Sequence, residues 1–319
     1  MIHKVSTRKV VIFRMWLKFK RFLELIRFSH TVFALPFALL AAFWAWTLRS
    51  PLEHSPVVFR WRHLCGILAC MVFARSFAMA FNRLTDWKWD RENPRTANRH
   101  LPAKLLQVGE VTWFAVFCAI LFVGSTLLFL PNRIPFLLSV PVLVFLGGYS
   151  LGKRFTWMVH LWLGVALMLA PICAWISLRG HIIEEVPWDI LPAVLLGLVV
   201  MFWVTGFDIL YACQDAEYDQ RSGLKSIPAR FGIKGALTIA KVLHFFMWIL
   251  ALGMSFWVPE LSLGLIFRLA MAVVGVLLIY EHSVVSERSM DRMQLAFFKL
   301  NSIISLVMLL AGSIDCWLR

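Results

Sequence analysis

WRHLCGILACMVFARSFAMAFNRLTDWKWD, residues 61–90, passes from an apolar run of membrane-spanning length into a stretch crowded with charge. A helix needs about 20 apolar residues to cross the hydrocarbon of a bilayer, and similar runs recur along all 319 residues. The mean hydropathy is +0.76 and 16% of the residues are charged, whereas a soluble protein carries about 25%. Because the apolar runs are continuous rather than alternating, they exclude a transmembrane β-barrel. We expect an all-α, polytopic membrane protein.

The apolar runs divide the chain into about nine predicted membrane segments. Their bounds are 30–48, 61–82, 108–129, 134–151, 158–178, 189–212, 235–257, 262–281 and 296–317. Residues 1–29 mix basic and apolar side chains, which predicts a basic amphipathic helix lying on an anionic membrane surface. Residues 30–319 then form a single transmembrane domain. Two unusually polar loops, 83–107 and 213–234, are expected to cap it.

The distribution of charge predicts the orientation in the membrane. The net charge of +14 could indicate nucleic-acid binding, but the basic residues sit in short segments between apolar runs, as topology signals do. With the N-terminus inside, cytoplasmic segments hold 23 lysine and arginine residues and the opposite side holds 7. We therefore expect a multi-pass protein of a bacterial-type inner or plasma membrane. Its N-terminus and both polar loops are expected to be cytoplasmic and its C-terminus outside.

Cysteine patterns point to no metal or redox site. The six cysteines lie in or beside apolar runs and form no C-x-x-C or Cys/His cluster. The sequence therefore supports neither a zinc site nor a disulfide framework.

Two polar sets stand out at predicted cytoplasmic helix ends. Asn82, Asp86 and Asp90 are spaced i, i+4, i+8, which stacks them on one face of a helix. The second set is Asp208, Tyr211, Asp215 and Asp219, also expected on one helical face. Facing carboxylates repel one another, and Mg²⁺, which binds oxygen ligands together with substrate phosphates, resolves that repulsion. The two sets therefore predict a seat for Mg²⁺ and a diphosphate.

Basic side chains on the same side would neutralise the remaining phosphate charge, with bidentate geometry available to arginine. The candidates are Arg95, Arg99, Lys153, Arg154, Lys225 and Arg230. Arg75 lies seven residues before Asn82, about 10 Å deeper in the membrane at the helical rise. An arginine inside a membrane segment indicates a functional site.

These motifs resemble those of the UbiA superfamily of intramembrane aromatic prenyltransferases. Asn82-x-x-x-Asp86-x-x-x-Asp90 with NPRTANRHLPA resembles the first Asp-rich motif, although Arg83 stands where a common variant has aspartate. Asp215-x-x-x-Asp219 with GLKSIPARFG resembles the second. YSLGKRFT, residues 149–156, and FSHTVFALPFALLAA, residues 28–42, resemble two further signatures. The matches span residues 28–232, and about nine helices around a central cavity is the architecture that the resemblance implies.

The resemblance implies Mg²⁺-dependent transfer of a polyprenyl group from its diphosphate to an aromatic ring carbon. It implies that Asp86, Asp90, Asp215 and Asp219 hold the metal and act in catalysis, together with Arg154. The expected substrate-binding residues are Asn82, Lys153, Arg75, Arg95, Arg99, Asp208, Tyr211, Lys225 and Arg230. Arg27 and His30 are candidates for an acceptor carboxylate. Partners are a polyprenyl diphosphate, a small aromatic acid and membrane lipid, with no nucleic acid and no obligate protein partner.

The residues are most similar to the 4-hydroxybenzoate polyprenyltransferase-like branch, which implies quinone biosynthesis. A dihydroxynaphthoate acceptor for menaquinone synthesis is the alternative, and haem farnesylation or chlorophyll prenylation is remoter. The sequence does not decide between the acceptors, the length of the prenyl chain or the oligomeric state. A CDP-alcohol phosphotransferase would need a longer Asp- and Gly-rich signature than the chain has. A transporter would more often place its charges near the bilayer midplane.

Overall fold

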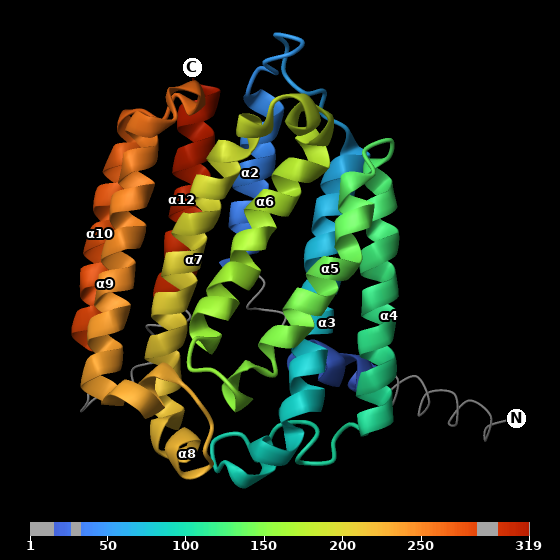
Figure 1. Ribbon diagram of the computed structural model, residues 1–319, viewed down its shortest axis with the longest axis vertical. Coiled ribbons are helices and arrows are strands. Elements are labelled where there is room, and N and C mark those ends of the chain that lie inside the picture. The colour runs from blue at the N-terminus through green and yellow to red at the C-terminus, as the bar shows by residue number, and fades with distance from the viewer. Residues whose placement is uncertain (1–15, 27–32, 286–298, 319) are drawn as a thin grey trace, which may run out of the picture.

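The computed structural model describes residues 16–26, 33–285 and 299–318, and these form a bundle of long helices. Figure 1 shows the helices running roughly parallel to the long axis. The part of the chain so described contains no strand, only an isolated bridge between Arg49 and Pro56. The fold class is therefore all-α, as predicted.

Nine helices of the described residues correspond to the nine predicted segments. They are α2 (Leu35–Thr47), α3 (Trp61–Glu92), α4 (Val108–Thr126), α5 (Ile134–Tyr149), α6 (Val159–Glu185), α7 (Leu191–Ala212), α9 (Ile227–Trp257), α10 (Leu265–Val284) and α12 (Asn301–Trp317). Short helices join them: η2 (Leu127–Phe129), η3 (Gly152–Arg154), η4 (Pro187–Ile190), η5 (Cys213–Asp215), α8 (Ala216–Arg221) and η6 (Pro259–Leu261).

Six helical stretches in this part of the chain are long and apolar enough to cross a membrane. They comprise α3, α4 with η2, α6, the run from η4 to α8, α9 and α10. The helices α2, α5 and α12 are apolar but have fewer than 18 residues. The chain is thus a polytopic membrane protein, and the count of nine crossings stays a prediction.

One end of the bundle carries the polar segments. Figure 1 shows α8 and the 93–107 segment covering this end, which we call the polar cap, while α12 ends at the opposite end. The predicted polar loops therefore share an end, and that end lies away from the C-terminal end of α12. Which side of the membrane the cap faces remains a prediction from the charge distribution.

Helix α3 continues ten residues beyond the segment predicted at 61–82. It ends at Glu92 because Asn93, which precedes Pro94, adopts an extended backbone with ψ 117°, and a residue before proline is disfavoured in the helical region. The first part of the expected loop 83–107 is therefore helix, and Asn82, Asp86 and Asp90 lie on one continuous helix as predicted.

The second acidic set lies on a helical run that is interrupted by a 3₁₀ turn, so it does not sit on one regular α-helix as expected. The α-helix ends at Ala212, Asp215 closes the 3₁₀ turn η5, and Asp219 lies on α8. The expected loop 213–234 also contains the start of α9, where the Ser226 Oγ accepts a hydrogen bond from the Ala229 N–H at 3.3 Å. Gly232, with φ 72°, then bends α9, a backbone region that favours glycine.

The described part of the predicted N-terminal surface helix is helical over residues 16–25. Trp16 and Phe19 are exposed, whereas Leu25 is buried. Phe22 stacks on Phe114 of α4 with ring centroids 4.7 Å apart. The helix therefore packs against the start of α4 while presenting aromatic side chains outward, and its place on a membrane surface stays a prediction.

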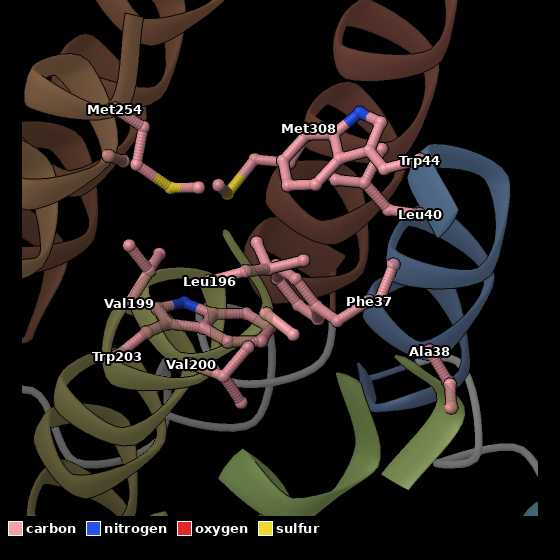
Figure 2. Packing of buried hydrophobic residues seen from close by; sticks show 14 of the residues in the cluster. Phe37, Ala38, Leu40, Trp44, Leu196, Val199, Val200, Trp203, Met254 and Met308 are labelled. Atoms are coloured by element: carbon pink, nitrogen blue, oxygen red, sulfur yellow. The ribbon is translucent and has the colours of Figure 1, made fainter. Parts of the chain in front are cut away.

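The main core lies where α2, α7, α9 and α12 meet. Figure 2 shows Phe37, Leu40 and Trp44 of α2 beside Leu196 and Trp203 of α7, with Met254 of α9 and Met308 of α12 closing the cluster. The Trp203 indole N–H donates to Asn301 Oδ1 at 2.7 Å, so the buried indole is satisfied. This packing fixes α7, the helix that leads into the second acidic set.

Gly164 lets α6 and α7 approach closely. A Cβ at this position would lie 2.2 Å from Thr205 Oγ1 and 2.6 Å from the Met201 carbonyl oxygen, and membrane helices often pack through such small residues. We expect Gly164→Ala to destabilise the protein by about 1–3 kcal/mol, because a backbone oxygen cannot move aside. Thermal unfolding of the detergent-solubilised protein measures this. Gly124→Ala is the control, since its Cβ would meet nothing within 4 Å; an equal effect from both substitutions would contradict the prediction.

Candidate active site

A cavity of about 420 Å³ opens among the helices and is lined mainly by α3, α5, α6 and α7. Its polar end lies against the polar cap and its other end is apolar. The apolar walls include Ile67, Phe122, Phe129, Leu138, Leu167 and Ala170. Asp208 also lines the cavity. The polar end is lined by these side chains: Asn82, Arg83, Asp86, Asp90, Asn93, Arg95, Thr96, Arg99, Tyr149, Lys153, Arg154, Tyr211, Asp215 and Asp219.

Helix α3 supplies the first acidic set, one side chain per turn. The Asn82 Nδ2 donates to Asp86 Oδ2 at 2.8 Å, and the Arg154 guanidinium lies 3.8 Å from the Asp86 carboxylate. Arg99 donates to Asp90 Oδ1 at 2.7 Å. The other Asp90 oxygen is buried and has no hydrogen-bond partner among the residues that the structure describes. The set thus presents carboxylate oxygens to the cavity beside two arginines.

Segment 93–107 holds Asp215 through two side chains. The Asn93 Nδ2 donates to Asp215 Oδ1 at 2.9 Å, and the Arg95 Nε donates to the same oxygen at 2.8 Å. The second guanidinium nitrogen of Arg95 pairs with Asp215 Oδ2, which makes the contact bidentate. Arg95 also donates to the Tyr211 hydroxyl at 3.0 Å. The loop after the first motif therefore anchors the second motif, 120 residues further along the chain.

Lys153 forms an ion pair with Asp219, as Arg95 does with Asp215. Its ammonium donates to the two Asp219 oxygens at 2.9 and 3.3 Å. Asp219 is almost fully buried, with 1% of its surface exposed, and a buried carboxylate needs such a partner. The Lys225 N–H donates to the Lys153 carbonyl at 2.7 Å, which ties η3 to the segment that follows α8.

Arg95 and Lys153, two cations outside the membrane helices, are held in their charged forms by the carboxylates beside them. Burial alone would lower the pKa of Arg95, but the hydrogen bonds and charge of Asp215 raise it above its usual value. Burial also acts to lower the pKa of Lys153, and the charge and hydrogen bond of Asp219 again outweigh it and raise the pKa. Both side chains therefore stay positively charged at physiological pH.

Arg154 is positioned by an aromatic ring and a backbone carbonyl. Its guanidinium lies 4.5 Å from the Trp89 ring centroid and donates to the Thr85 carbonyl at 2.8 Å. Stacking of this kind fixes the plane of the guanidinium. Arg154 therefore reaches the polar end along α3, beside Asp86.

Lys225 and Arg230 do not line the cavity, although the sequence predicted both as substrate contacts. The Lys225 ammonium donates to the Phe155 carbonyl at 3.1 Å, and Arg230 lies over the Trp157 ring at 4.8 Å. Arg75 does line the cavity, on its deeper part. Arg27 and His30, predicted for an acceptor carboxylate, lie outside the described residues.

Sequence reasoning missed several residues that line the site. Asn93 holds Asp215, and the Tyr218 hydroxyl donates to the Trp89 carbonyl at 2.8 Å, which joins α8 to α3. His160 contacts Asp208 at 2.7 Å. Asn93 is the first residue of the NPRTANRHLPA motif and precedes Pro94, so the sequence did contain a signal that could have identified it as a site residue. His160 offered none, because one histidine on an apolar helix resembles a core residue.

The donor chemistry of the polar end fits Mg²⁺, which binds through one or two carboxylates plus substrate phosphates rather than through an all-protein cage. Within the described ranges no three acid, histidine or cysteine side chains converge closely enough to hold a metal by themselves. Four carboxylates line one cavity end, and one buried Asp90 oxygen lacks a partner there among the described residues. Asp86, Asp90, Asp215 and Asp219 are the residues that fit the ion.

The model of the UbiA prenyltransferase family matches residues 34–303 of the chain. The chain belongs to this family. Among solved structures, the UbiA homologue from Aeropyrum pernix K1 in its apo form has a TM-score of 0.75 and 28% identity, over 89% of this chain and 97% of that one. A UbiA homologue from Archaeoglobus fulgidus bound to DMAPP and Mg²⁺ has a TM-score of 0.67 at 20% identity, over 94% and 100%. That second likeness shows the UbiA fold alone.

The family includes named relatives at modest identity. The 4-hydroxybenzoate geranyltransferase 1 of Lithospermum erythrorhizon is 27% identical over 60% of this chain and 58% of its own. The matched part of the chain thus spans less than two thirds of that relative. The 4-hydroxybenzoate octaprenyltransferase of Vibrio vulnificus is 26% identical over 94% of this chain and 99% of its own. The match to the Vibrio relative therefore extends over nearly the whole chain, and the match to the Lithospermum relative covers 60% of it.

Proposed function

We propose that the protein transfers a polyprenyl group from a polyprenyl diphosphate to a 4-hydroxybenzoate-like aromatic acid in quinone biosynthesis, with Mg²⁺ as cofactor. The observation that carries this proposal is the shared cavity: both acidic sets line its polar end, and its other end is apolar. A prenyl diphosphate has the same two parts, a charged head and an apolar chain. The names of the 4-hydroxybenzoate transferases from Lithospermum and Vibrio support the acceptor class.

In this proposal the acidic residues of the polar end bind the metal and the basic residues bind the diphosphate. Asp86, Asp90, Asp215 and Asp219 hold Mg²⁺, and the Archaeoglobus homologue, solved with DMAPP and Mg²⁺ bound, supports that cofactor. When bound, Mg²⁺ neutralises charge on the leaving diphosphate. Arg154 and Lys153 bind its remaining oxygens and stabilise the charge that develops as the carbon–oxygen bond breaks. Arg95 and Arg99 close the site from the segment after α3, with Asn82 and Tyr211 as further polar contacts.

The apolar end then receives the prenyl chain and keeps water away from the allylic cation. Arg75 and Asp208 lie between the two ends, where an aromatic acid would meet the allylic carbon. A dihydroxynaphthoate carries the same ring hydroxyl and acid group, so it remains the alternative acceptor, tested in the same assay. We place the polar cap in the cytoplasm, where diphosphates are made, in agreement with the distribution of basic residues.

An acceptor panel tests the proposal. Purified protein in detergent should prenylate 4-hydroxybenzoate or a dihydroxynaphthoate with geranyl or a longer diphosphate, and release one diphosphate per product. Mass spectrometry of the product identifies the acceptor. Failure to prenylate any acceptor, with either donor and with Mg²⁺ present, would refute the proposed activity.

Ala170 offers a test of the apolar end as the chain-binding region. It lines the cavity on α6, about 15 Å along the helix from His160 at 1.5 Å per residue. We expect Ala170→Phe to lower kcat/KM for a long-chain donor more than about tenfold and to leave geranyl diphosphate within about threefold, because the new ring blocks only the far part of the cavity. Val144→Phe on α5, 70% exposed and outside the cavity lining, is the control. A uniform loss with both donors would contradict this role.

A further inference from the structure

His160 and Asp208 form a buried pair that the carboxylate–diphosphate arrangement does not use. The His160 Nδ1 lies 2.7 Å from Asp208 Oδ2, and the histidine is 1% exposed. Both residues line the cavity. The second ring nitrogen, Nε2, is buried without a hydrogen-bond partner in the described part of the chain.

The carboxylate determines what this second nitrogen can do. When Nδ1 donates its proton to Asp208, the neutral imidazole carries its lone pair on Nε2, which then accepts a hydrogen bond or a proton. A buried acceptor left without a donor costs about 1–3 kcal/mol. A purely structural histidine would normally satisfy both nitrogens. The hydrogen bond to Asp208 therefore satisfies Nδ1, and Nε2 is left as a buried acceptor whose missing donor a hydroxyl would supply.

Its depth matches the reacting end of the substrate. Asp208 lies within α7, before the 3₁₀ turn η5 that ends at Asp215, so it is about two turns further from the polar cap than Asp215. His160 is the second residue of α6, six residues after Arg154, the last residue of the turn η3. Phe207, next to Asp208, and Leu163, one helical turn after His160, also line the cavity. The pair therefore lies between the diphosphate-binding end and the apolar end.

We propose that Nε2 of His160, oriented by Asp208, binds the ring hydroxyl of the aromatic acceptor and accepts its proton as the ring is prenylated. This inference rests on the proposed function and names a residue that acts on the acceptor. Asp208 is a positioning residue, since it acts through the histidine.

The step balances in atoms and electrons. The ring carbon beside the hydroxyl attacks the allylic carbon, a carbon–carbon bond forms, and the carbon–oxygen bond to diphosphate breaks with its electron pair leaving on diphosphate. The hydroxyl proton passes to Nε2, which leaves a neutral dienone. The ring proton at the new bond then leaves to a diphosphate oxygen. His160 returns its proton to the ring oxygen, so the aromatic product and the neutral histidine are restored.

The first test compares His160→Gln with wild type, using two acceptors. Glutamine keeps a polar atom near Nε2 but is not a base. We expect kcat to fall about 100-fold with 4-hydroxybenzoate, in the range general bases contribute, while thermal stabilisation by geranyl diphosphate with Mg²⁺ stays unchanged. With a fluorinated hydroxybenzoate whose hydroxyl is already ionised at the assay pH, the loss should shrink below about tenfold. Asp208→Asn should show the same pattern with a smaller loss.

His181→Gln is the matched control, because this histidine lies exposed at the other end of the same helix and does not line the cavity. It should behave as wild type. An equal loss with both acceptors in His160→Gln, or wild-type rates with 4-hydroxybenzoate, would overturn the assignment of His160 while leaving the proposed function in place.

A binding experiment tests the role of His160 independently of the proposed prenyl transfer. The probe is 4-hydroxy-3-nitrobenzoate, whose absorbance reports ionisation of its hydroxyl. At a pH below the pKa of the free probe, wild-type protein should bind it as the phenolate, and His160→Gln should bind it as the neutral phenol. If the protein shows this spectral shift but prenylates no acceptor, the role of His160 in binding the hydroxyl is supported and the proposed transfer reaction is refuted. Absence of the shift in wild type would overturn the role of His160.

Discussion

Replacing Asp215 with asparagine is expected to reduce prenyl transfer at least about 1,000-fold, because it removes one of the negative charges that we propose to bind the metal. Asparagine keeps the shape of the side chain and can still accept the hydrogen bond that Asn93 donates at 2.9 Å. Because asparagine is neutral, it cannot neutralise the positive charge of the Arg95 guanidinium, which pairs with both Asp215 oxygens. The substitution therefore changes charge with little change in packing.

The measurement is kcat/KM for geranyl diphosphate with 4-hydroxybenzoate in detergent. Glu217→Gln provides a matched control two residues away. The Glu217 side chain is 86% exposed and pairs only with Arg221 of the same short helix among the described residues, so its loss should leave kcat/KM within about twofold, as surface substitutions usually do. Size-exclusion profiles of both variants check folding. Near-normal transfer by a folded Asp215→Asn variant would refute the assignment of the second acidic set.

Removal of divalent metal is expected to abolish transfer, and Mg²⁺ to restore it. Five carboxylates line the cavity, from Asp86, Asp90, Asp208, Asp215 and Asp219. A diphosphate that entered alone would be repelled by them, and three of these acids already engage Arg95, Arg99 and Lys153. Mg²⁺ lets carboxylates and phosphate oxygens share one ion instead.

A metal titration measures this dependence and links it to particular residues. EDTA should reduce product formation below detection, and adding Mg²⁺ in excess should return the full rate. In Asp90→Asn the Mg²⁺ concentration for half-maximal rate should rise about tenfold or more, since a ligand has been lost. The exposed control Glu217→Gln should keep the wild-type value. Transfer at full rate in EDTA would show that the acidic sets serve another purpose.

The parts of the fold that the sequence predicted are those decided by local pattern. Apolar runs of membrane length predicted the helices, and the i, i+4, i+8 spacing placed Asn82, Asp86 and Asp90 on one face of α3. The helix boundaries depended on more local detail. Asn93 before Pro94 ends α3 at Glu92, ten residues beyond the apolar run, because charged residues can extend a helix out of the membrane without continuing its apolar pattern.

The rest of the site depends on contacts between distant segments. Asp215 was predicted from its motif, but its partners Asn93 and Arg95 come from a loop 120 residues earlier. The break in helix at Cys213–Asp215 also has no sequence signal such as proline or glycine. Lys225 and Arg230 were assigned by charge and proximity in sequence alone, and the tertiary fold turns them toward Phe155 and Trp157 instead.

The length of α3 has a consequence for how a lipid-like donor reaches the protein. From Trp61 to Asn82 the helix rises about 32 Å, close to the thickness of the hydrocarbon layer. With the predicted span placed in the hydrocarbon, the carboxylates of Asp86 and Asp90 stand at headgroup level. A polyprenyl diphosphate resting in a bilayer already has its head at that level and its tail below. The donor that we propose would therefore move into the protein sideways, in the orientation it holds as a membrane lipid, and its charged head would not have to enter the hydrocarbon.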